Sequence, residues 1–206
     1  MAELNFNDFD FVLNRLIIPI VFAIIPLCIN YYRKDIEKYL KKGKKRPLLF
    51  FLDGFRIELG NWRYTILAPL FIALLFVIIT DLYFSWLRQP FVSYGEPFWF
   101  SSLTSGILAP IAEEFIFRGF FISFAIFLGL YLIKPHTKNT EFIVNNVALF
   151  VITFFFALGH PNRTVFDFMA RFLLGLLAGL LYVLSERNLL PPMIAHAVFN
   201  WYVILK

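Results

Sequence analysis

Long apolar runs separated by short polar segments form the main pattern along this chain. A helix that spans a membrane needs about 20 predominantly apolar residues. Six stretches approach or exceed that length, namely residues 11–32, 64–87, 98–133, 142–159, 166–185 and 190–205. The pattern therefore predicts an all-α protein, a polytopic bundle of about six transmembrane helices.

The stretch 98–133 is longer than one membrane crossing requires. As an α-helix it would extend for about 54 Å, whereas the hydrocarbon core of a bilayer is about 30 Å thick. We expect either one long tilted helix or two shorter passes broken near residues 118–119. The polar positions that follow, Lys134, His136 and Lys138, mark a loop and favour the single helix.

Charge and composition narrow the class of protein. Hydrophobic residues make up 60% of the 206 positions, compared with about 45–50% in an average soluble domain. The basic segment 33–46 is expected on the cytoplasmic side, followed by an interfacial segment anchored by Trp62 and Tyr64. Because the basic residues flank apolar spans, nucleic-acid binding is a poor interpretation. The single cysteine, Cys28, leaves no partner for an intrachain disulfide.

Several ionisable side chains lie within apolar stretches or at their ends. A charged group at the centre of a bilayer costs about 2.5–3.5 kcal/mol on insertion scales, so it needs a partner or a function. These side chains are Glu113, Glu114, Arg118, His160 and His196. A further pair, Asp167 and Arg171, is four residues apart near the start of 166–185 and is interpreted as structural.

Helical spacing predicts how these groups face. Glu114 and Arg118 share a face and can form an ion pair, whereas Glu113 is rotated by about 100° and meets a different neighbour. Two further pairs repeat the four-residue spacing, Phe156 with His160 and His196 with Asn200. Each residue alone is more often a packing residue than a catalytic one, but adjacent glutamates with two histidines on separate helices favour a catalytic site.

Three short motifs occur in order, one in each of three apolar segments. The motifs are E-E-x-x-x-R at Glu113, Glu114 and Arg118, F-x-x-x-H at Phe156 and His160, and H-x-x-x-N at His196 and Asn200. Any one motif is weakly specific, but the ordered set of three is strongly specific. Over residues 98–202 this order resembles that of the Rce1-like proteases, also called CAAX-processing and bacteriocin-processing proteases.

The resemblance implies a glutamate-dependent intramembrane endopeptidase and a role for each motif residue. Glu113 would be the general base and would hold the attacking water together with His160. His196 and Asn200 would bind the oxyanion of the tetrahedral intermediate. Supporting residues would fix the helix and orient the general base, and these are Glu114 and Arg118.

The same resemblance sets the expected organisation and partners. Residues 98–206 would form a four-helix catalytic core and residues 1–97 the N-terminal helices with the basic loop, within a single membrane domain. The substrate would be a peptide or a lipidated, for example prenylated, protein; eukaryotic relatives remove the last three residues of prenylated CAAX proteins. No cofactor and no metal ligand is assigned. The protein would be multi-pass, in the cell membrane of a prokaryote or the endoplasmic reticulum of a eukaryote.

Two other interpretations remain open. Glu113, His160, His196 and Glu114 could instead ligate zinc in a metalloprotease, although the chain has no H-E-x-x-H motif. Alternatively, the buried charges could only hold helices together in a membrane scaffold or an immunity-type protein.

Membrane depth poses a specific difficulty for a shared site. If 98–133 is one pass, Glu113 and His196 lie at similar depth, but His160 lies too near the outer end. A tilted helix, or a helix that begins late near Asn146, would bring the three side chains to one level.

Overall fold

The structure is a computed structural model, and it describes most of the chain from residue 53 onward. The predictions for 11–32 and for the basic segment 33–46 lie almost entirely outside the described residues. Described are 20, 21, 24 and 31, then 53–87, 98–133, 137–160 and 164–205, without the side chains of 83–87.

The described part of the chain is almost entirely helical, with no strand beyond one isolated β-bridge, which confirms the predicted fold class. Among the residues that the structure describes, four helices are long and apolar enough to cross a membrane, and a fifth, α10, is apolar but shorter. The total of six spans remains a prediction. The five apolar helices are 63–87 (π-helix η3, Arg63–Leu67, then α4, Ala68–Leu87), Phe98–Leu132, α8 (Lys138–Leu158), α9 (Val165–Leu184) and α10 (Leu190–Leu205).

Phe98–Leu132, called here the long helix, is a single helix without a break near Arg118. It alternates between α-helical and wider π-helical segments, and such π segments are frequent at functional sites. Glu113 and Glu114 end the central α segment, directly before the second π segment. The segments in order are α5 (Phe98–Leu103), η4 (Thr104–Leu108), α6 (Ala109–Glu114), η5 (Phe115–Ile122) and α7 (Ser123–Leu132).

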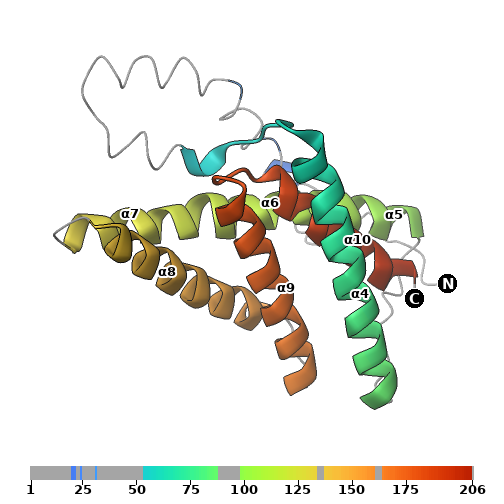
Figure 1. Cartoon of the computed structure of the whole chain (residues 1–206). Helices are drawn as coiled ribbons and strands as arrows, with labels where there is room; N and C mark the ends of the chain where they lie inside the picture. Colours follow the sequence, from blue (N-terminus) through green and yellow to red (C-terminus); the bar gives the residue numbers. More distant parts are fainter. Residues whose placement is uncertain are drawn as a thin grey trace.

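The direction of the long helix resolves the difficulty of membrane depth. Figure 1 shows it running across α9 and α4 rather than alongside them. α8 begins at Lys138, capped by the Thr137 side chain, so a late start near Asn146 is not the explanation. Because the long helix is inclined to its neighbours, Glu113 near its middle can meet a residue at the end of α8.

Helices α8 and α9 form an antiparallel pair that packs closely through two glycines. A Cβ atom at Gly175 would lie 2.8 Å from Phe156 Cδ1. A Cβ atom at Gly179 would overlap Leu149 Cδ1. The four-residue spacing of these two glycines permits close helix contact, and it brings the end of α8 against the middle of α9.

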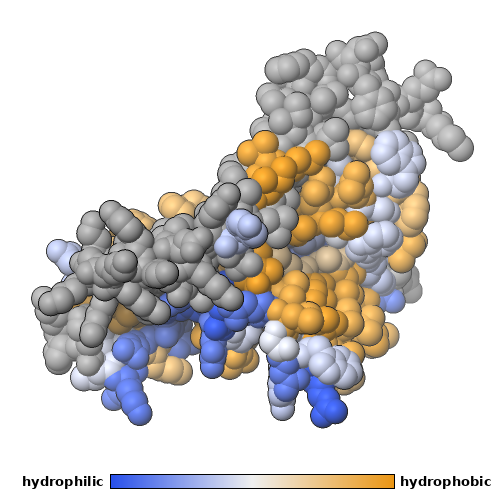
Figure 2. Space-filling view, turned by 90° about the horizontal axis from the view of Figure 1, so that it is seen from above, coloured by the Kyte–Doolittle hydropathy of each residue, from blue (hydrophilic) through white to orange (hydrophobic). Residues whose placement is uncertain are grey.

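The outer surface is largely apolar, as expected of a protein in lipid. Figure 2 shows hydrophobic side chains over broad areas, with hydrophilic ones gathered toward one edge. The exposed side chains of α4 include Phe71, Leu74 and Ile78, and those of α8 include Phe142 and Phe155. Several polar side chains are buried instead, among them Glu114, Arg118 and His196.

A short polar segment ties the N-terminal side of α4 to the loop between α9 and α10. Arg56 Nη2 donates to the carbonyl oxygens of Ser185 (2.8 Å) and Glu186 (2.6 Å). Asn188 accepts from the Glu58 amide (3.1 Å) and donates to the Glu58 carbonyl (2.6 Å). The loop reverses through left-handed backbone at Glu186 and Arg187. We call Arg56, Glu58, Ser185, Glu186 and Asn188 the clamp.

Candidate active site

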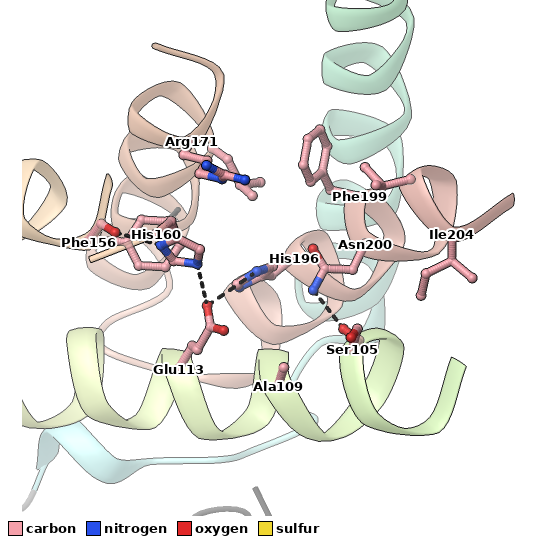
Figure 3. Close-up of a pocket in the computed structure, with 12 residues that line it drawn as sticks. Ser105, Ala109, Glu113, Phe156, His160, Arg171, His196, Phe199, Asn200 and Ile204 are labelled. Carbon is pink, nitrogen blue, oxygen red and sulfur yellow. Dashed lines mark hydrogen bonds and ion pairs between the residues drawn. The ribbon is translucent and has the colours of Figure 1, made fainter. Parts of the chain in front are cut away.

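The three sequence motifs meet at one cavity of about 320 Å³. Glu113 reaches it from α6, His160 from the turn after α8, and His196 and Asn200 from α10 (Figure 3). Its lining is Ser105, Ala109, Glu113, Phe156, His160, Arg171, Leu174, His196, Phe199, Asn200, Val203 and Ile204.

Glu113 lies between the two imidazoles. Its Oε2 atom is 3.4 Å from His160 Nε2 and 3.7 Å from His196 Nε2. Both distances exceed those of a good hydrogen bond, and Oε2 has no hydrogen-bond partner among the described residues. The carboxylate therefore retains acceptor capacity within reach of two ring nitrogens.

The orientation of His160 is set by its own helix. Its Nδ1 lies 2.7 Å from the carbonyl oxygen of Phe156, and a carbonyl only accepts, so Nδ1 carries the proton. Nε2 then faces Glu113. Burial by itself lowers the pKa of the His160 imidazole, but Glu113 and the Phe156 carbonyl outweigh burial, so the pKa is raised above its ordinary value.

A second carboxylate, Glu114, orients His196 from the side of the ring that faces away from the cavity. Its Oε1 is 2.8 Å from His196 Nδ1, and its Oε2 is 3.1 Å from Arg118 Nε. All three side chains are almost completely buried. Because a carboxylate accepts hydrogen bonds, Nδ1 of His196 donates to Glu114 and Nε2 points into the cavity. The predicted pairing of Glu114 with Arg118 is confirmed, and Glu114 also connects the first motif to the third.

Arg118 holds the long helix against two of its neighbours, α8 and α9. Its Nη2 donates to the carbonyl oxygen of Gly175 in α9 at 2.8 Å. Its guanidinium lies 4.5 Å from the centre of the Phe156 ring in α8, within the range of a cation–π interaction. One buried arginine thus fixes where the Glu113 segment lies relative to α8 and α9.

Phe156 is the aromatic centre of the site. Its ring is 4.5 Å from the His160 ring and 5.9 Å from the His196 ring, centre to centre. The Phe117 ring packs edge-on against it, with the ring centres 5.1 Å apart. The first residue of the F-x-x-x-H motif therefore packs against both imidazoles and helps to set the spacing between them.

Asn200 faces the same cavity and is anchored to the long helix. Its Nδ2 donates to the carbonyl oxygen of Ser105 at 2.7 Å. Ser105 belongs to the π segment η4, where the backbone pattern of the α-helix is interrupted. An amide NH₂ carries two hydrogens, so one N–H can still donate to a ligand.

Sequence reasoning missed two features of the cavity. Ser105 contributes to the site through its backbone carbonyl, and no side-chain pattern in the sequence identifies such a residue. Arg171 was interpreted as structural, yet it lines the cavity. An arginine in the first two turns of an apolar helix was the available signal. Within the described ranges, no group of three or more His, Cys, Asp or Glu side chains is arranged to hold a metal ion.

Comparisons with known proteins agree with the motifs. No curated protein and no solved structure matches the chain significantly. A family model described as type II CAAX prenyl endopeptidase Rce1-like matches residues 95–202. That range covers slightly more than half of the chain and includes every residue of the three motifs, so the chain belongs to the Rce1-like family of CAAX-type membrane proteases.

Proposed function

We propose that this chain is an intramembrane endopeptidase in which Glu113 activates a water molecule for peptide hydrolysis. The observation that carries the proposal is the position of Glu113 Oε2, at 3.4 and 3.7 Å from two imidazole nitrogens in the wall of a cavity. A water placed among these three atoms would be oriented by hydrogen bonds to each of them.

The reaction would begin with proton transfer from water to Glu113. The resulting hydroxide attacks the carbonyl carbon of the scissile peptide bond, and the carbonyl oxygen becomes an oxyanion. Glu113 then passes its proton to the leaving nitrogen as the C–N bond breaks. General acid–base catalysis of this kind contributes about 10²–10⁴-fold to a rate.

His196 and Asn200 would stabilise the oxyanion. His196 donates from Nδ1 to Glu114, so a proton on Nε2 makes an imidazolium whose charge the Glu114 carboxylate balances. Asn200 adds an amide N–H from the next turn of α10. Donors fixed in place before reaction, in a site shielded from water, stabilise developing charge more strongly than water does.

The substrate would be a short extended segment of a membrane-associated peptide or a lipidated protein. The cavity volume is near the lower end of the range for small-molecule sites, so it does not admit folded protein. A lipid anchor would keep the substrate at the bilayer and raise its local concentration. The family description points to a prenylated C-terminus.

The decisive experiment replaces Glu113 with Gln and measures cleavage of a quenched fluorescent peptide that carries a prenylated cysteine near its C-terminus. Glu113→Gln should lower the rate by about 10²–10⁴-fold while the protein stays folded and binds the peptide. The matched control is Glu141→Gln, an exposed glutamate at the start of α8. Wild-type turnover by folded Glu113→Gln contradicts the proposal and favours a non-catalytic membrane protein.

A second arm addresses metal dependence. The purified enzyme is assayed after treatment with a strong chelator and again after zinc is added back. The mechanism above predicts unchanged turnover in both samples. Loss of activity that zinc restores would favour the metalloprotease interpretation.

A further inference from the structure

Arg171 lies in the wall of the catalytic cavity but outside the three motifs. It is a half-buried residue of α9, and Figure 3 shows it beyond His160, on the side of the cavity away from Glu113. An ionisable side chain in an apolar helix that faces a polar cavity indicates a functional role.

The other charged side chains of the site contact one another. Glu113 is faced by the two imidazoles, and Glu114 is paired with Arg118. Arg171 adds a permanent positive charge to the lining. It takes part in a further interaction within the protein, but a guanidinium has five N–H donors in a planar fork. It can therefore also bind a carboxylate with two parallel hydrogen bonds.

Apolar side chains line other parts of the same cavity. They would accept the hydrocarbon side chains of a substrate segment while the cation binds an anionic group beside them. These side chains are Leu174, one turn further along α9, and Phe199, Val203 and Ile204 from α10.

We propose that Arg171 binds a carboxylate of the substrate, foremost the carboxylate at the end of its chain, and so selects peptides cleaved near their C-terminus. The inference rests on the proposed proteolysis and extends it to substrate selection. A small cavity with a reactive group on one side and a cation on the other fits the end of a peptide chain. A chain that continued beyond the cavity would need a second opening through which to leave it. A side-chain carboxylate of Asp or Glu offers the same chemistry and is distinguished by experiment.

The test compares three forms of one prenylated peptide: the free acid, the C-terminal amide, and the amide with Asp in the last position. In the wild-type enzyme, amidation should lower kcat/KM by about 10- to 100-fold, the worth of a charged hydrogen-bonded contact. In Arg171→Gln, acid and amide should be cleaved equally. The matched control, Arg63→Gln at the exposed start of η3, should keep the wild-type preference.

The outcomes separate a binding role from a structural one. If Arg171→Gln lowers cleavage of acid and amide by the same factor, or if wild type does not prefer the acid, the proposal is overturned. If the Asp-containing amide is cleaved like the free acid and this depends on Arg171, the carboxylate site stands and accepts side chains as well.

A binding measurement makes the test independent of catalysis. The dissociation constants of the acid and amide peptides are measured on Glu113→Gln protein and on the double variant with Arg171→Gln. A preference for the acid that disappears in the double variant supports the carboxylate site, even if proteolysis itself were not observed. Equal affinities for acid and amide in both proteins contradict it.

Discussion

Two polar clusters hold the bundle together, and their central side chains, Asn188 in the clamp and Glu113 in the cavity, differ in how completely they are bonded. In the clamp, Asn188 Oδ1 accepts from the amides of Glu58 and Leu190 at 3.1 Å each, and Nδ2 donates to the Glu58 carbonyl. In the cavity, Glu113 Oε2 has two imidazole nitrogens at 3.4 and 3.7 Å, longer than a good hydrogen bond. The bonded cluster fixes the fold, whereas the incompletely bonded cluster can still bind a reactant.

The buried hydroxyl groups of Ser123 and Tyr182, near the clamp, are also hydrogen-bonded. Tyr182 donates to the carbonyl of Gly54 at 3.0 Å, so Ser123, at 2.8 Å, donates to the Tyr182 oxygen. Gly54 packs so closely on the long helix that a Cβ atom there would overlap Ser123. These contacts hold the residues before α4 against the long helix and α9, and they present no unused acceptor to the cavity.

The largest expected effect is a loss of activity with little loss of stability. His160→Gln removes the ring nitrogen that faces Glu113 and should lower kcat by about 10²–10⁴-fold. The His160 side chain is about one quarter exposed, so the thermal midpoint should change little. Rates from the peptide assay and melting curves in detergent measure both. A fall in melting temperature that accounts for the lost activity would make His160 a packing residue instead.

The second largest effect should lower both the rate of peptide cleavage and the melting temperature. Arg118→Met removes the cation paired with the buried Glu114 carboxylate and leaves it only the bond to His196. Breaking a buried pair costs about 3–5 kcal/mol of folding free energy. Activity should fall as well, because Glu114 orients His196. The double variant Glu114→Gln with Arg118→Met should regain much of the stability but not the activity. If the single and double variants were equally unstable, the ion pair would not be the cause.

A smaller effect tests the clamp. Asn188→Ala removes three hydrogen bonds and leaves amide groups at Glu58 and Leu190 without that partner, which should cost about 1–3 kcal/mol of stability. The kcat of the folded fraction should stay at the wild-type value, because the clamp presents no group to the cavity. Denaturant or thermal unfolding measures the first quantity and active-site titration the second. A reduced kcat at full folding would show that the clamp also positions the site.

The smallest effect concerns the hydroxyl pair. Tyr182→Phe keeps the ring and removes one hydroxyl, so it should lower stability by about 0.5–1.5 kcal/mol and leave kcat unchanged. Ser123→Ala provides the matched removal of the other hydroxyl. A loss of activity in either variant, measured at a temperature where the protein is fully folded, would contradict the division between the two clusters.

The local features were largely predictable from the sequence. The apolar run 190–205 became α10 with the expected bounds, and the spacing of Glu114 and Arg118 predicted their ion pair. The start of α8 was expected four residues late, because its first turn is polar and is held by a cap rather than by burial. Hydropathy and four-residue spacing depend on neighbours along the chain, so sequence alone can reveal them.

Contacts between helices were decided only by the tertiary structure. The sequence left open whether Glu113, His160 and His196 could share one level, and the inclination of the long helix brings them together. The bond from Glu114 to His196, the Ser105 carbonyl that holds Asn200, and the position of Arg171 in the cavity wall had no signature in the sequence. The physical reason is that crossing angles follow from packing over whole helix surfaces, including Gly175 and Gly179, whereas the motifs specify only which side chains each helix carries.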